Sequence, residues 1–115
     1  MKLEVVNQSD SHLIIAFSGE MDAQGCSEVK PDIEALVTEP KALHILVDMD
    51  CVNFLDSSGI GAIVYLYKRV KSNGGSLSIE GANGQPLELM ELLRIGSAIP
   101  INKNPDDRLS FSGAS

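Results

Sequence analysis

Apolar and polar residues along the N-terminal part of the chain are arranged as in a pair of β-strands. Residues 3–6 and 12–17 are short runs in which most side chains are apolar and several are β-branched. The residues between them, 7–11, are all polar and have the composition of a turn. We therefore expect an N-terminal β-hairpin.

Three later segments repeat apolar residues at intervals of three and four, which predicts helices. The first extends to Val37, and we place the start of its regular part near Ser27, because a proline at position 31 fits only in a first turn or at a kink. The second covers residues 60–70 and ends at a glycine-rich cap near residue 73. The third begins near Pro86, since proline is tolerated in a first turn.

Short apolar runs between these helices predict further strands. Residues 43–47 have the branched content of a strand that helices cover on both faces, and residues 77–79 form another run. Residues 99–101 contain a proline, which suits an edge strand, and residues 110–115 read as a frayed tail. This order predicts one α/β domain over residues 1–115, a mixed and mostly parallel sheet with an N-terminal hairpin and about three to four helices.

Charge and composition narrow the possible partners. The 115 residues contain 9 Lys+Arg and 16 Asp+Glu, a net charge of −7, which argues against nucleic acid and against an anionic membrane as partners. No signal sequence and no apolar run long enough to span a membrane is present, which predicts a cytoplasmic protein. Cys26 and Cys51 are too few for a disulfide framework or a zinc site, and we expect both as buried thiols.

The segment that follows the third strand is unusual for the start of a helix. Asp56 is a good N-cap, yet the next residues include two serines and two glycines, which are poorer helix formers than alanine. Gly59 and Gly61 remove side-chain bulk, so another backbone or a partner can approach closely. A serine here lies near free amides that favour an anion such as phosphate, although Asp56 opposes it. A simple capping turn explains the same residues.

Enzymatic alternatives find little support in the sequence. Neither Ser57 nor Ser58 has the glycine two positions earlier that a hydrolase nucleophile elbow requires, and no phosphate-binding loop motif is present. His12 and His44 lie in apolar runs, which favours core or edge positions over catalysis. We expect no cofactor and no metal ion, because no lysine accompanies the three carboxylates that could suggest a magnesium site, Asp48, Asp50 and Asp56.

Residues 54–61, Phe-Leu-Asp-Ser-Ser-Gly-Ile-Gly, resemble the signature of STAS domains, the family of the anti-sigma factor antagonists. Residues 19–22, Gly-Glu-Met-Asp, are similar to the Gly-Glu-Leu-Asp that follows the second strand in that family. The Gln-Pro pair at 85–86 and the segment 92–96 match its proline-started helix and final glycine step. The resemblance covers roughly residues 3 to 110.

The resemblance implies a phosphorylation switch rather than an enzyme. Ser57 matches the serine that an anti-sigma factor phosphorylates, and this partner is itself the serine kinase that holds ATP and Mg²⁺. A serine phosphatase would reset the switch. Asp56 matches the acidic neighbour of that serine, and Asp22 the acidic residue of the adjacent loop. The partner-binding loop is then completed by Ser58, Gly59, Ile60 and Gly61.

The sequence departs from the family pattern at two places, and two other functions are still possible. Gln85 replaces the usual serine or asparagine, and residues 97–98 replace a common apolar step. Both are expected to lie away from the phosphorylation loop and to bear on partner identity. The alternatives are a STAS subunit that acts as a structural partner in a lipid-transport or stressosome-like assembly, and an enzyme with Ser57 as nucleophile.

Overall fold

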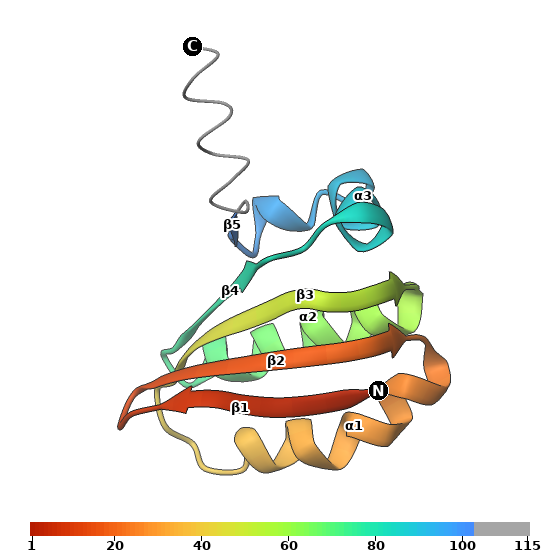
Figure 1. Cartoon of the computed structure of the whole chain (residues 1–115). Coiled ribbons are helices and arrows are strands. Elements are labelled where there is room, and N and C mark those ends of the chain that lie inside the picture. The colour runs from red at the N-terminus through yellow and green to blue at the C-terminus, as the bar shows by residue number, and fades with distance from the viewer. Residues whose placement is uncertain (103–115) are drawn as a thin grey trace.

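The computed structural model describes residues 1–102 and contains a five-stranded sheet in the order β1-β2-β3-β4-β5 (Figure 1). The strand β1 (Lys2–Gln8) pairs antiparallel with β2 (His12–Met21), which confirms the predicted hairpin. The next three strands run parallel to β2 and to one another: β3 (His44–Leu55), β4 (Ser76–Glu80) and β5 (Ile101–Asn102). The predicted tail at 110–115 lies outside the described residues.

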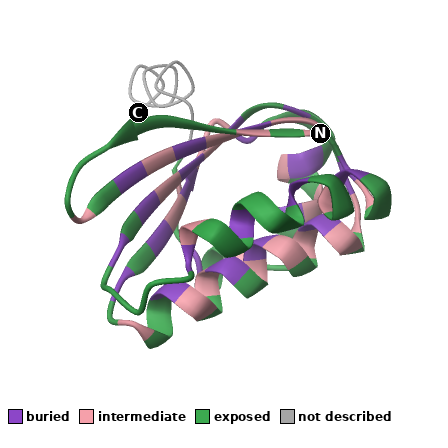
Figure 2. Ribbon diagram, turned by 90° about the horizontal axis from the view of Figure 1, so that it is seen from below, coloured by how far each residue is buried: buried purple, intermediate pink, exposed green. Residues whose placement is uncertain are grey.

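Two helices, α1 (Ala23–Leu36) and α2 (Ser57–Ser72), cover one face of the sheet (Figure 2). Alternate residues of β2, β3 and β4 are buried under them and form most of the core. A third helix, α3 (Gly84–Leu92), and a short 3₁₀ turn, η1 (Ile95–Ser97), follow β4, within the predicted three to four helices. None of the helices within residues 1–102 is long and apolar enough to cross a membrane.

The strand β3 is much longer than the apolar run at 43–47 predicts. It continues to Leu55, and its later buried residues, Met49, Val52 and Leu55, are spaced by three instead of two. The spacing changes because the pairing with β2 shifts its register between Ala16 and Ser18 and again after Gly19. Because of these bulges, the second half of β3 lacks the simple alternation of buried and exposed residues that is typical of a strand.

The helix α1 also begins earlier than predicted. Its first residue is Ala23, four residues before Ser27, because the Asp22 side chain accepts a hydrogen bond from the Gly25 amide at 2.8 Å and caps the helix there. Pro31 lies inside this helix and is exposed. Its missing amide would bond to the Ser27 carbonyl, another exposed residue, so water can satisfy that carbonyl.

The strand β1 carries an irregularity of its own at the edge of the sheet. Its pairing with β2 shifts between Val5 and Asn7, so Val6 lies at a bulge and its side chain is exposed. Lys2 and Glu4 are exposed earlier on the same strand. The first strand therefore contributes little to the core and carries a mixed polar and apolar surface.

Candidate functional site

The helices α1 and α2 begin next to one another at one edge of the sheet (Figure 1). Met21 ends β2 and Leu55 ends β3, and these two residues are partners in the parallel pairing. The backbone amide of Asp56 donates to the Met21 carbonyl at 3.3 Å, which links the two strand ends. The predicted site residues Asp22 and Asp56 therefore both lie at the C-terminal ends of β2 and β3.

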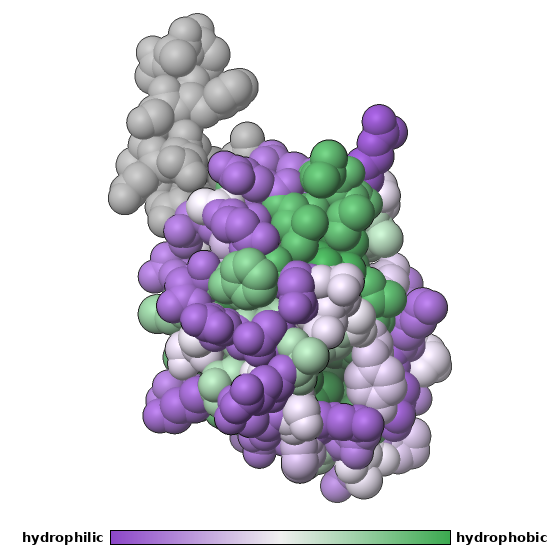
Figure 3. Space-filling view, turned by 90° about the vertical axis from the view of Figure 1, so that its right-hand side faces the viewer, coloured by the Kyte–Doolittle hydropathy of each residue, from purple (hydrophilic) through white to green (hydrophobic). Residues whose placement is uncertain are grey.

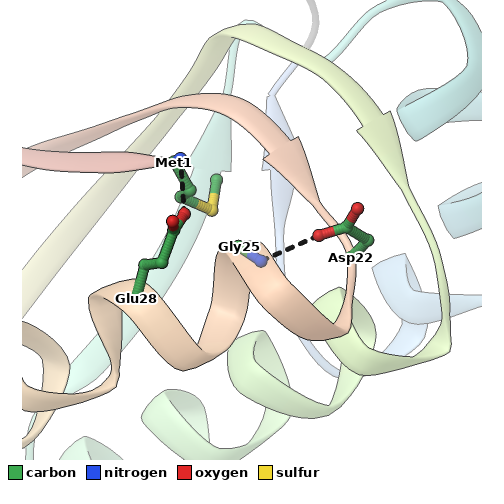
Figure 4. A network of polar contacts seen from close by, with 4 residues as sticks. All are labelled: Met1, Asp22, Gly25 and Glu28. Atoms are coloured by element: carbon green, nitrogen blue, oxygen red, sulfur yellow. Dashed lines mark hydrogen bonds and ion pairs between the residues drawn. The ribbon is translucent and has the colours of Figure 1, made fainter.

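Both aspartates cap a helix, and the cap formed by Asp56 fixes the backbone on both sides of Ser57. The Asp22 cap on α1 lies beside an ion pair between the Met1 ammonium and Glu28 (Figure 4). Asp56 Oδ1 accepts from the amide of Ser58 at 2.9 Å and from the amide of Gly59 at 3.3 Å. Ser57 is the first residue of α2 and is exposed, whereas Ser58 is half-buried.

The two glycines of the first turns of α2 differ in what surrounds them. A Cβ atom at Gly59 would lie 2.7 Å from the Met21 carbonyl oxygen and would also overlap the Leu55 side chain. This glycine allows the helix to pack on the ends of the chain's own strands. A Cβ atom at Gly61 would meet nothing within 4 Å, and Gly61 is exposed one turn after Ser57. Only Gly61 leaves room for a partner.

Gln85 stabilises the end of β3, directly before Asp56 and Ser57. The sequence did not indicate this role. Its side-chain amide donates to the Leu55 carbonyl at 2.7 Å and accepts from the Leu55 amide at 2.9 Å. The strand β4 pairs with β3 only as far as Asp48, so the glutamine from α3 takes the place of a neighbouring strand at the end of β3. The expectation that residue 85 lies away from the phosphorylation loop is wrong.

The expectation of two buried thiols is also wrong. Cys51 is exposed, because the altered spacing of β3 turns it away from the helices. Cys26 is half-buried on α1, and its pKa is raised above the ordinary value by burial first and then by the carboxylates of Asp56 and Asp22. Cys26 thus lies in a partly buried region that the carboxylates of both capping residues face.

A groove lies between α1 and α2, the helix that begins at Ser57. Cys26 and Lys30 line it from α1, and Ala62 and Tyr65 line it from α2. Arg69 donates to the Tyr65 hydroxyl at 2.9 Å and to a backbone carbonyl after α1, which holds the tyrosine side chain at the groove. The groove offers a partner apolar contacts along the helix that begins at Ser57.

A separate apolar area lies in the upper part of the face drawn in Figure 3, the level at which Figure 1 places α3. Two large apolar side chains are exposed where α3 ends, those of Leu92 and of the following residue Leu93, and Leu92 is 77% exposed. Phe54 is exposed near the end of β3, close to Ser57 in sequence. The surface around Ser57, at the C-terminal ends of β2 and β3, therefore combines negative charge with exposed apolar side chains.

The structure does not assemble the alternative chemistry around Ser57. His12 and His44 are exposed at the starts of β2 and β3, whereas Ser57 follows the end of β3, so neither histidine reaches the serine as a base. The Asp48 carboxylate accepts from the Asp50 backbone amide at 2.9 Å. Within residues 1–102, no group of three or more histidines, cysteines or carboxylates is placed to hold a metal ion.

Comparison with protein families decides the relationship, because the family model for the STAS domain matches residues 5–107. The chain belongs to the STAS domain family. This STAS domain is 26% identical over 98 residues to the anti-sigma F factor antagonist of Paenibacillus polymyxa, which is 85% of this chain and 84% of the relative. The resemblance seen in the sequence is therefore confirmed.

Solved structures share the fold of this STAS domain. A STAS domain protein from Planctomyces limnophilus superimposes with a TM-score of 0.75 at 18% identity and covers 98% of both chains. The Bacillus cell fate determinant SpoIIAA in its phosphorylated form superimposes with a TM-score of 0.67 at 13% identity, over 96% of this chain and 99% of that one. These likenesses confirm the predicted α/β class.

Proposed function

We propose that this STAS domain is an anti-sigma factor antagonist of the cytoplasm, a binding module switched by phosphorylation of Ser57. Unphosphorylated, it binds an anti-sigma factor that is also a serine kinase and supplies ATP and Mg²⁺. Phosphorylation releases the partner, and a serine phosphatase restores binding. The observation that carries the proposal is the exposed position of Ser57 at the start of α2, directly after the aspartate that caps the helix. The name of the Paenibacillus relative supports the class of partner.

The local geometry favours Ser57 over Ser58 as the modified residue. A kinase must surround the accepting hydroxyl, which requires an exposed side chain. Ser57 is exposed, whereas Ser58 is half-buried and its amide is bound to the Asp56 carboxylate. Modification of Ser58 would disturb the cap of α2, and modification of Ser57 would not.

The charge added by phosphorylation is large enough to release a partner. A phosphoserine carries about −1.5 to −2 charges at pH 7. Two like unit charges about 4 Å apart repel by about 4 kcal/mol at an effective dielectric constant of 20, and by about 1 kcal/mol in water. A hundredfold loss of affinity requires only about 2.7 kcal/mol. A carboxylate of the partner close to Ser57, or the desolvation of the phosphate itself, supplies that difference.

The fold itself is expected to survive the modification. Asp56 already occupies the amides of Ser58 and Gly59, and the core lies on the inner side of α2, away from Ser57. The positive end of the helix dipole also stabilises a nearby phosphate. We therefore expect the switch to act through the charge on the contact surface, without refolding of the domain.

The proposed contact surface extends from the two caps along α2. It includes Asp22, the exposed positions Ser57 and Gly61, and the groove in which Tyr65 lies. The absent side chain at Gly61 lets a partner approach the helix backbone. The other members of the predicted loop have less exposed area, so they contribute through position: Asp56, Ser58, Gly59 and Ile60.

The test is calorimetry with the kinase from the same host and three variants of this chain. Ser57→Ala is expected to bind as the wild type does and to resist phosphorylation. Ser57→Asp is expected to bind at least about a hundredfold more weakly, by the charge argument above. Ser58→Ala is the matched control, and it should still accept one phosphate, seen as a mass increase of about 80 Da.

Equal affinities of Ser57→Ala and Ser57→Asp for the kinase would contradict the switch. A phosphate mapped by tandem mass spectrometry to another residue would contradict the assignment of Ser57. An acyl adduct formed on Ser57 with an ester substrate would instead support the enzyme alternative.

A further inference from the structure

Two histidines lie side by side on the face of the sheet that α1 and α2 do not cover. His12 begins β2 and His44 begins β3, and they are partners in the parallel pairing. Their neighbours Leu13 and Ile45 are buried under the helices, so the histidines point to the opposite face, where both are exposed. The two ring centroids are 5.2 Å apart and the rings are tilted by 33°.

A serine hydroxyl lies within hydrogen-bond distance of Nδ1 in each of the two histidines. Ser11 Oγ lies 3.1 Å from Nδ1 of His12, and Ser76 Oγ lies 2.8 Å from Nδ1 of His44. Ser76 is the partner of His44 on β4, so His12, His44 and Ser76 form a row across three strands. When Nδ1–H donates to the serine oxygen, the lone pair of the ring is on Nε2, the arrangement typical of histidines that bind metals.

The separation of the two rings is that of imidazoles sharing one metal ion. Two rings that bind a tetrahedral zinc ion through Nε2 at about 2.0–2.1 Å have each centroid about 3 Å from the metal and about 5 Å from one another. The observed separation of the ring centroids, 5.2 Å, agrees with this value. Imidazole is a ligand for Zn²⁺, Cu²⁺ and Ni²⁺ rather than for Mg²⁺ or Ca²⁺. The net charge of −7 also favours cation binding.

We propose that His12 and His44 form a binding site for one divalent transition-metal ion, with Zn²⁺ as the reference ion. The two Nε2 atoms are the protein ligands, water occupies the remaining positions, and Ser11 and Ser76 orient the rings. The site lies at the starts of β2 and β3, whereas Ser57 follows the end of β3, so it is separate from the proposed phosphorylation site.

The experiment is a titration of the metal-free protein with Zn²⁺ alone, followed by calorimetry and by NMR of the histidine ring nitrogens. One ion per chain is expected, with changes at Nε2 of both rings. His12→Gln and His44→Gln should each weaken binding by at least about tenfold, because loss of a mere supporting partner already costs 10–100-fold. Ser76→Ala should weaken binding within that range and leave both ligands in place.

Control variants separate this site from other zinc ligands. Cys51 is an exposed thiol on β3, so Cys51→Ser is the matched control and should bind Zn²⁺ as the wild type does. All four positions are exposed, and the metal-free variants should unfold at the wild-type temperature. The proposal is overturned by the absence of binding up to millimolar Zn²⁺, by wild-type affinity in either histidine variant, by loss of binding in Cys51→Ser, or by one ion per two chains.

Discussion

Replacement of Gln85 by alanine tests whether one side chain holds the end of β3 in place. The change removes two hydrogen bonds, 2.7 Å and 2.9 Å long, between the side-chain amide and the backbone of Leu55. Each is worth about 1 kcal/mol net, and an orphaned buried amide costs about 1–3 kcal/mol. Leu55 is fully buried, but Gln85 itself is exposed, so water can reach part of the vacated space. We expect the free energy of unfolding to fall by about 2 kcal/mol.

Urea denaturation measures this loss directly. For a domain of this size, about 2 kcal/mol corresponds to a fall in Tm of roughly 8 °C. Hydrogen exchange adds a local measurement, because the Leu55 amide donates to Gln85 and should exchange faster in the variant than in the wild type. The matched control is Gln24→Ala, an exposed glutamine on α1, for which the free energy should change by less than about 0.5 kcal/mol.

Unfolding of Gln85→Ala at the same urea concentration as Gln24→Ala would contradict this role of Gln85. A wild-type exchange rate of the Leu55 amide in the Gln85→Ala variant would contradict it as well. Either result would mean that the pairing of β3 with β2 holds the end of the strand without help from α3. The residue before Asp56 and Ser57 would then be positioned by the sheet alone.

Gly59→Ala should lower the free energy of unfolding by about 1–3 kcal/mol, because the added methyl group overlaps the Leu55 side chain and the Met21 carbonyl. Gly61→Ala should raise it by up to about 1 kcal/mol, because the position is open and alanine favours the helix; equal effects in urea would refute the difference between the two sites. The raised pKa of Cys26 predicts slow alkylation by iodoacetamide near pH 8, because little thiolate is present. Asp56→Asn lowers that pKa and should speed the reaction a few-fold, and an unchanged rate would contradict the effect of the carboxylate.

Much of this fold is local and could be predicted from the sequence. The hairpin follows from two short apolar runs and the polar turn between them, and the cap at Asp56 follows from one carboxylate before two serines. The continuation of β3 to Leu55 could not be predicted, since its spacing depends on bulges in the pairing with β2. The position of Pro31 inside α1 depends on the Asp22 cap, which only the structure reveals as the start of the helix.

In the candidate site, too, features set by neighbouring residues could be predicted, whereas contacts between residues far apart in the sequence could not. The motif around Ser57 is contiguous, so a resemblance over eight residues sufficed to select it. Gln85 lies thirty residues from Leu55 in the sequence, and no local pattern connects the two. The environment of Cys26 likewise depends on two aspartates from different loops, which meet only because β2 and β3 end together.

The bulge near Val6 affects how the chain behaves at high concentration. An outer strand with regular spacing would let a second molecule extend the sheet, and repeated addition would produce fibres. Here the register shift between Val5 and Asn7 interrupts any continuous ladder of new hydrogen bonds. The exposed charges of Lys2 and Glu4 add that a strand pairing here would need opposite charges at the facing positions. The exposed valines can therefore remain on the surface without making this strand a template for aggregation.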